Sequence, residues 1–204
     1  MITINIDLES AVEVKALVLF DHNITNAATI TLIGVDPALF SEAVTWADDK
    51  ILHYLSVATT KRYWQLQITD ASNPDGYIEI GELFLGSYVE FSRTYDPNVK
   101  VSSKIFLDVD TTAYGVRKTR FRNYQQSFGL NFPDMLAADN ALLEAMLDNI
   151  GSRNTGIFKT FFFNRDSDYP NTSWMVELES IPQTWPSNNY YSFNLPLIEV
   201  VKSL

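Results

Sequence analysis

Residues 62–86 read RYWQLQITDASNPDGYIEIGELFLG, and this stretch decides the fold class. Its first part, 62–69, alternates bulky apolar side chains with polar ones, and a period of two is typical of a half-buried strand. Asn73-Pro74-Asp75-Gly76 then favours a tight turn, because proline presets φ and glycine accepts a positive φ. A second strand is expected over 77–86, with a bulge at Gly81. The stretch therefore predicts two antiparallel strands joined as a hairpin.

The rest of the first half adds further short strands. They are expected at 2–8, 12–20, 28–33 and 51–58. The first alternates apolar and polar residues, whereas the second ends in a wholly apolar run, as in a strand buried on both faces. Within 35–50 we expect at most a short helix, because Asp36-Pro37 suits a helix N-terminus. Short strands at regular spacing predict an antiparallel β-sandwich over residues 1–93.

The character of the chain changes after Thr94-Tyr95-Asp96-Pro97-Asn98, which we interpret as a linker to a second domain over 94–204. One main helix is expected there, at 134–150, because apolar residues recur at steps of three and four with acidic residues such as Asp139 between them. Gly151 stands where a C-terminal cap belongs. Strands are expected at 102–109, 119–132, 156–163, 174–181 and 190–201. This order predicts an α+β domain built as a β-barrel or sandwich with one main helix, so that the whole chain is mainly β.

The composition excludes several kinds of chemistry. The chain has no cysteine, so it has no disulfides, no thiolate nucleophile and no cysteine-ligated metal. Its net charge of -10 makes nucleic acid an unfavourable partner, because an acidic surface repels phosphate. The N-terminus lacks the basic and apolar regions of a signal peptide, and no run approaches the roughly 20 apolar residues that span a bilayer. We expect a soluble chain without an export signal or membrane insertion.

Recognisable catalytic motifs are absent from the sequence. His22 and His53 are the two histidines, and neither has partners at the spacing of a metal site or a general base, so we expect both to be structural. No nucleophile elbow, phosphate-binding loop or dinucleotide motif occurs. Residues 70–76 are similar to a calcium loop, but Pro74 takes a ligand position, which favours a hairpin turn. We expect no catalytic site, no cofactor and no metal.

Two groups of residues are candidates for contacts with a ligand or a partner. The first is a basic cluster at 117–124, which contains Arg117, Arg120 and Arg122. Its interleaved aromatics allow a nucleic-acid interpretation, but in an acidic chain a solvated or subunit-facing row that meets an acidic neighbour is favoured. The second group is Trp185, which is expected in a polar loop, together with Tyr190. The tryptophans within predicted strands are expected in the core.

Two stretches resemble a known architecture. Residues 16–30, an apolar strand followed by His22-Asn23-Ile24-Thr25, are similar to a segment of the galactose-binding-like (discoidin-type) β-sandwich of tail-tip structural proteins of tailed phages. Residues 63–86 resemble the closing hairpin of the same domain. The resemblance implies that these residues are architectural. The second half is similar, in its order of elements, to the domains with which tail-tube and distal tail proteins form rings.

One departure from that architecture concerns the front of the sandwich. Domains of this kind begin with more strands before the His22-Asn23 phrase than the two expected here, 2–8 and 12–20. Either the sandwich is reduced, or a neighbouring subunit covers its open edge, since an uncovered edge invites aggregation.

The sequence therefore predicts a non-catalytic virion structural protein of a phage tail tip, or baseplate, assembled in the host cytoplasm. We expect its partners to be other tail proteins and copies of itself in a symmetric oligomer. The alternative is a carbohydrate-binding module that recognises a cell-surface glycan, and the two are compatible because a tail tip also contacts its host. A third hypothesis, a glycosidase or esterase, needs a carboxylate pair or a triad that one sequence does not reveal.

Overall fold

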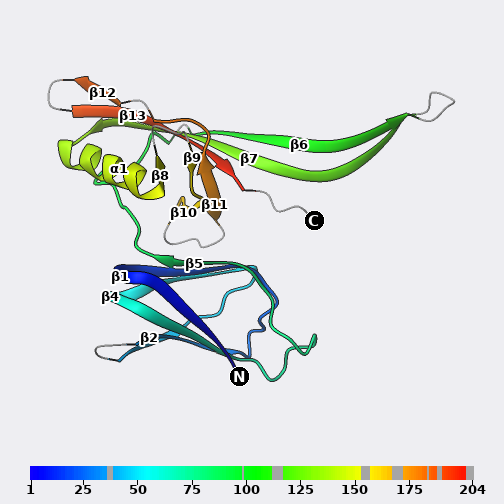
Figure 1. Ribbon diagram of the computed structural model, residues 1–204. Helices are drawn as coiled ribbons and strands as arrows, with labels where there is room; N and C mark the ends of the chain where they lie inside the picture. The colour runs from blue at the N-terminus through cyan, green and yellow to red at the C-terminus, as the bar shows by residue number, and fades with distance from the viewer. Residues whose placement is uncertain are drawn as a thin grey trace. The chain divides into compact units, whose positions relative to one another are not determined.

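The computed structural model is mainly β, with one main helix and two large antiparallel sheets, as the sequence predicts. It describes residues 1–35, 39–97, 99–111, 117–152, 157–166, 172–182, 184–187 and 190–200. The chain divides into two compact units (Figure 1). Unit 1 comprises Met1–Tyr88 and Arg165–Thr172, and unit 2 comprises Val89–Asn164 and Ser173–Leu204.

Unit 1 contains a five-stranded antiparallel sheet in the order β3-β2-β4-β1-β5. Its strands are β1 (Ile2–His22), β2 (Thr29–Val35), β3 (Phe40–Val44), β4 (Lys50–Thr69) and β5 (Ile80–Gly86). Two of them, β1 and β4, are about three times as long as the others. These long strands let one sheet supply both layers of the unit.

The two long strands pair with each other on both sides of a bulge but have different outer neighbours there, β2 on one side and β5 on the other. The first part of β1, Ile2–Asp7, pairs with the second part of β4, which also pairs with β2. The register then shifts between Asp7 and Val12, where Glu9 has a φ of 64°. Beyond the shift, β1 pairs with the first part of β4 and with β5. Such bulges bend a strand and increase its twist, so the sheet folds over on itself.

The core of unit 1 lies between these two parts of the sheet. Trp64, Leu66 and Ile68 come from the part that contains β2, and Leu17 and Leu19 from the part that contains β5. All five side chains are essentially inaccessible to water. The alternation that predicts Trp64, Leu66 and Ile68 on one face is therefore confirmed, and the unit has the character of a reduced sandwich.

Four local predictions for unit 1 are wrong. The strands expected at 2–8 and 12–20 are one strand, as are those expected at 51–58 and 62–69, because bulges carry the pairing across the polar interruptions. The residues expected to hold a short helix form β3, which pairs with β2. The register between β5 and β1 runs across Gly81 without a bulge. Asp36-Pro37 lies outside the described residues.

The turn at Asn73–Gly76 forms, but it does not close a hairpin. The backbone N–H of Gly76 donates to the carbonyl of Asn73 at 3.2 Å, and Gly76 has a φ of 73°. The strands on either side, β4 and β5, are not neighbours, because β1 lies between them in the sheet. The loop thus crosses the end of β1, and this crossing brings it against the loop that follows β1.

Unit 2 contains a six-stranded sheet and one helix, α1 (Ala137–Ile150). The main strand order is β10-β11-β13-β7-β6, with β12 paired to β13, and β8 and β9 form a separate two-stranded ribbon. The strands are β6 (Lys100–Thr111), β7 (Arg117–Met135), β8 (Gly151–Ser152), β9 (Ile157–Phe158), β10 (Phe161–Asn164), β11 (Ser173–Leu178), β12 (Thr184–Ser187) and β13 (Tyr190–Glu199).

The core of unit 2 is formed by alternate residues of β7 and β13 together with one face of α1. Leu143 and Leu147 of the helix pack with residues such as Phe132 and Phe193, whose rings stack with centroids 4.8 Å apart. The predicted helix is confirmed, although it begins three residues later than expected, because Met135 still belongs to β7. The predicted linker at 94–98 contributes to this packing, since Tyr95 lies against the same core.

Candidate functional site

The two sequence phrases that carry the resemblance meet in unit 1. Asn23, after β1, donates its side-chain amide to the Asp75 carboxylate and to the carbonyl of Tyr77, both at 3.0 Å. The oxygen of the Asn23 side-chain amide accepts a hydrogen bond from the backbone N–H of Glu79 at 2.7 Å. The side-chain amide of Asn73 donates a hydrogen bond to the backbone carbonyl of Asn23 at 3.0 Å. These bonds hold the two loops together, which is an architectural role.

In the loop that is similar to a calcium site, residues 70–76, the first carboxylate, that of Asp70, is hydrogen-bonded to Thr25. Asp70 accepts the backbone N–H and the hydroxyl of Thr25, at 2.7 and 2.8 Å. The backbone bond from Thr25 is the main reason that the pKa of Asp70 is lowered. Within the described ranges, no group of three His, Asp or Glu side chains is placed to hold a metal ion. The Asp70 carboxylate is therefore used in hydrogen bonds within the protein.

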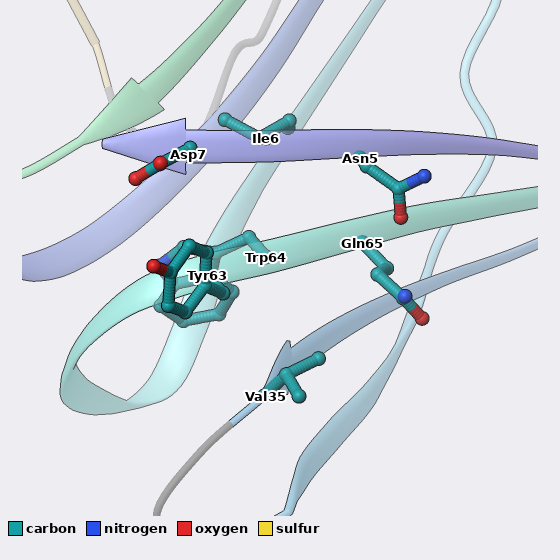
Figure 2. Close-up of a pocket in the computed structure, with 7 residues that line it drawn as sticks. All are labelled: Asn5, Ile6, Asp7, Val35, Tyr63, Trp64 and Gln65. Atoms are coloured by element: carbon teal, nitrogen blue, oxygen red, sulfur yellow. The ribbon is translucent and has the colours of Figure 1, made fainter. Parts of the chain in front are cut away.

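A shallow groove lies on the outer face of the unit 1 sheet, where β1, β4 and β2 run side by side (Figure 2). Its volume is about 240 Å³. It is lined by Asn5, Ile6, Asp7, Val35, Tyr63, Trp64 and Gln65. The register places Asn5 directly opposite Gln65, so two amide side chains stand next to each other. The sequence gives no signal for this groove, because it is assembled from strands that are distant in the chain.

One residue of the groove lining, Asp7, forms an ion pair with Arg62. Arg62 binds Asp7 through two nitrogens, at 2.7 and 2.8 Å, and its guanidinium lies 4.7 Å from the centroid of the Tyr63 ring. The hydrogen bond from Arg62 lowers the pKa of Asp7. Asp7 also accepts the N–H of Glu9, the residue with positive φ at the bend. The pair neutralises itself, so the groove offers amides and an aromatic ring without net charge.

Trp185 and Tyr190 lie on the outer face of unit 2. Trp185 was expected in a loop, but it lies in β12 and pairs with Ser192 of β13. Trp185 is 51% exposed and Tyr190 is 41% exposed. The guanidinium of Arg93 lies 5.6 Å from the centre of the Tyr190 ring. A shallow hollow around Trp185 is lined by Ser180, Ile181, Asn194 and Pro196. The two aromatic side chains are therefore accessible to a ligand or partner.

The basic residues Arg117, Arg120 and Arg122 lie in β7, where β7 and β6 form a two-stranded arm. β7 pairs with β13 only over Ser127–Met135, and the arm runs on beyond that point (Figure 1). Arg117 is exposed. The register places Arg120 opposite Asp108 of the same chain and skips Arg122, so simple alternation does not hold there. The side chains of Arg120 and Arg122 lie outside the described part.

The apolar face of the unit 2 sheet continues onto this arm. Val101 pairs with Phe128, a core residue of β7, and Ile105 pairs with Tyr124 further along. Here the side chains are exposed: 47% for Val101, 60% for Ile105 and 50% for Tyr124. A two-stranded ribbon with exposed apolar side chains is marginally stable alone in water, so this part of the arm is the least covered apolar surface described for unit 2.

One polar site was not predicted from the sequence. Asp139, expected on the outer side of the helix, is buried in the first turn of α1. Its carboxylate accepts the backbone N–H and the hydroxyl of Ser92, at 2.7 and 2.6 Å, and the N–H of Leu136 at 3.1 Å. Burial raises its pKa, but the bonds from Ser92 and Leu136 outweigh burial, so the pKa is lowered overall. Asp139 thus ties the segment before β6 to the helix.

The two histidines lie on strands of the unit 1 sheet. His22 ends β1, and its burial lowers its pKa, against the opposing effect of the Ala47 backbone and of Asp48. His53 lies on β4, where its Nε2 atom is 3.3 Å from the carboxylate of Glu42 on β3. Neither stands beside a second histidine or a hydroxyl group in the interactions of the described residues.

Comparison with models of protein families, with curated proteins and with solved structures found no match for this chain. In the described part of the chain, α1 is too short to cross a membrane, and no other helix there meets the length and apolarity needed.

Proposed function

We propose that the protein is a structural subunit of a phage tail tip and that unit 2 makes its contacts with neighbouring subunits. The observation that carries the proposal is the β6–β7 arm, whose apolar face extends beyond the part of β7 that pairs with β13. Residues 100–126 contain six Lys and Arg against two Asp, in a chain whose net charge is -10. A basic, apolar arm on an acidic chain suits contact with another copy, because the opposite charges attract.

The outer face of unit 2 supports the same role. Trp, Tyr and Arg are the residue types that most often dominate the energy of protein interfaces. Trp185, Tyr190 and Arg93 are exposed there, and Arg93 and Tyr190 are in contact. Unit 1 contributes architecture, since the two phrases that resemble tail-tip sandwiches hold each other in place through Asn23. These features require no catalysis.

The proposal is tested by locating the protein on phage particles. An antibody against the chain, detected by negative-stain microscopy with a gold label, is expected to mark the distal end of the tails of phage particles from the same source. Label that never appears on tails, with the same antibody marking the free protein, would contradict the proposal.

A second candidate function is the recognition of a neutral glycan, and the groove of unit 1 favours it. Asn5 and Gln65 carry amides that both donate and accept, next to the exposed ring of Tyr63 (Figure 2). Such a set suits hydroxyl groups that also donate and accept. A glycan array is expected to show binding that Tyr63→Ala abolishes and Trp185→Ala leaves unchanged. No binding by the intact chain, with or without Ca²⁺, would remove this candidate.

A further inference from the structure

Among the strands that the structure describes, the long strand β6 has a free edge. It is the last strand of its sheet, and in the described residues it pairs with β7 alone. Natural sheets protect such edges with charges, bulges or short strands, because a free edge pairs readily with another chain. The irregularity in this arm lies on β7, where the register skips Arg122, whereas β6 continues from Phe106 to Leu107 without an extra residue. The free edge of β6 is therefore long and regular.

The sequence of this edge is self-complementary when it is read in the antiparallel direction. Its centre reads Lys104-Ile105-Phe106-Leu107-Asp108. In an antiparallel pair of two such strands centred on Phe106, Lys104 of each copy faces Asp108 of the other. Ile105 faces Leu107, and Phe106 faces Phe106. Opposite charges and apolar residues in direct cross-strand positions stabilise a sheet.

The geometry of a strand restricts where the centre of such a pair can lie. Successive residues direct their N–H and C=O groups alternately to the two sides of the strand. Two free edges therefore pair only when the two-fold axis passes through a residue, since an axis between residues would set outward groups against inward ones. An axis through Lys104 would set two like charges against each other. An axis through Ile105 would set Lys104 against Phe106 and Ser103 against Leu107, so an axis through Phe106 is favoured over both.

The contacts on the described part of the arm agree with this arrangement. Lys104 and Phe106 lie on the same face of β6, with the Lys104 Nζ atom 5.0 Å from the centre of the Phe106 ring. Within one chain, Asp108 stands opposite Arg120 and Lys104 opposite Gln125. Pairing two arms through β6 would thus place Arg120, Asp108, the Lys104 of the second copy and its Gln125 in one row. In that row, Asp108 would lie between two cationic residues, Arg120 and the Lys104 of the second copy.

We propose that two copies of this chain pair antiparallel through the β6 edge, centred on Phe106, to form a continuous four-stranded ribbon. The interface is isologous, because each strand presents the same residues to the other. It brings the exposed side chain of Ile105 against Leu107 of the second copy. The pairing deepens the proposed assembly role of unit 2 and rests on it, because it names the partner and the register of one contact.

Cysteine cross-linking in the full chain tests the register, because the chain has no cysteine of its own. Phe106→Cys is expected to form a disulfide-linked dimer under mild oxidation, since the two residues face each other. Ile105→Cys is the matched control: its two copies would be diagonal neighbours, about 7–8 Å apart, too far for a disulfide. Faster cross-linking of Ile105→Cys than of Phe106→Cys, or none by either, would overturn the proposal.

A charge exchange tests the same contact without cysteine. Lys104→Asp and Asp108→Lys are each expected to weaken self-association at least several-fold, because like charges then face each other. An equimolar mixture of the two variants is expected to restore association, since every facing pair is again opposite in charge. A mixture that stays as weak as either variant would overturn the proposed register.

The failure of this pairing and the failure of the assembly role give different results. If the intact chain associates in sedimentation velocity but Phe106→Cys does not cross-link, the pairing is wrong and assembly through another surface stands. If the intact chain stays monomeric and the gold label still marks tails, the contacts are with other tail proteins. If the chain is monomeric and the label never marks tails, both proposals are wrong.

Discussion

Replacing Asp139 by alanine should destabilise unit 2 more than any other change of a single polar side chain described above. Asp139 is only 2% exposed, and its carboxylate accepts three hydrogen bonds, two from Ser92 and one from Leu136. A hydrogen bond to a charged group contributes about 1.5–3 kcal/mol, but Ser92 and Leu136 lie near the surface, where water can replace part of each bond. We therefore expect Asp139→Ala to lower the free energy of unfolding by about 2–3 kcal/mol.

Urea unfolding followed by circular dichroism at the helix wavelength measures this loss, because α1 is the main helix of the chain. Asp139→Asn keeps the shape and one oxygen, so it should cost about 1 kcal/mol. Ser92→Ala is expected to be non-additive with Asp139→Ala, since the bond from the Ser92 hydroxyl is lost in both variants. A loss below about 0.5 kcal/mol for Asp139→Ala, a size typical of surface substitutions, would refute the account of this site.

The stability of unit 2 should also fall at acidic pH, because Asp139 contributes to it only while its carboxylate is ionised. The folded state lowers the pKa of Asp139, so its contribution is present above the ordinary carboxyl value and is lost as the pH falls through the lower, folded value. Asp139→Asn should remove that part of the acid sensitivity. An unchanged acid profile in this variant would contradict the assignment of the hydrogen bonds.

Three further predictions concern unit 1. Asn23→Ala should speed hydrogen exchange in residues 70–79, because the Asn23 amide holds that loop; unchanged exchange would contradict this. The pKa of His22 is lowered by burial, so unit 1 should lose stability as the pH falls from about 7 to about 5, and His22→Gln should flatten the thermal-unfolding profile over this range. Gly34→Ala should cost about 1–3 kcal/mol in urea unfolding, because the added carbon would lie 2.5 Å from Lys61 Cδ and 3.2 Å from the Trp64 ring; a smaller loss would mean that Lys61 moves freely.

The parts of the fold that depend on local periodicity could be predicted from the sequence. Alternation gives the strand that carries Trp64, Leu66 and Ile68, and steps of three and four give α1. The turn at Asn73–Gly76 follows from proline and glycine. What the turn joins could not be predicted, because β1 lies between β4 and β5 and strand order depends on contacts distant in the chain.

The candidate surfaces likewise combine features that the local sequence indicates with features that depend on contacts distant in the chain. Trp185 and Tyr190 could be singled out by residue type, but their place on a strand pair depends on β12, whose four residues contain a proline and look like a loop. Asp139 looks like a solvent-facing acid until Ser92 is brought against it by the path of residues 89–97. The groove beside Tyr63 has no local signal at all, since Asn5 and Gln65 become neighbours only through the register of β1 with β4.

Sedimentation velocity of the intact chain, over a range of concentrations, tests most directly whether the β6–β7 arm is an assembly element. The matched variant replaces Val101 and Ile105 by serine, two exposed side chains whose loss should leave the circular dichroism spectrum unchanged. The intact chain is expected to sediment as a dimer or larger species as its concentration rises, whereas the variant is expected to stay monomeric. A monomeric intact chain at every concentration, or a variant that associates as strongly as the intact chain, would contradict self-assembly through the arm.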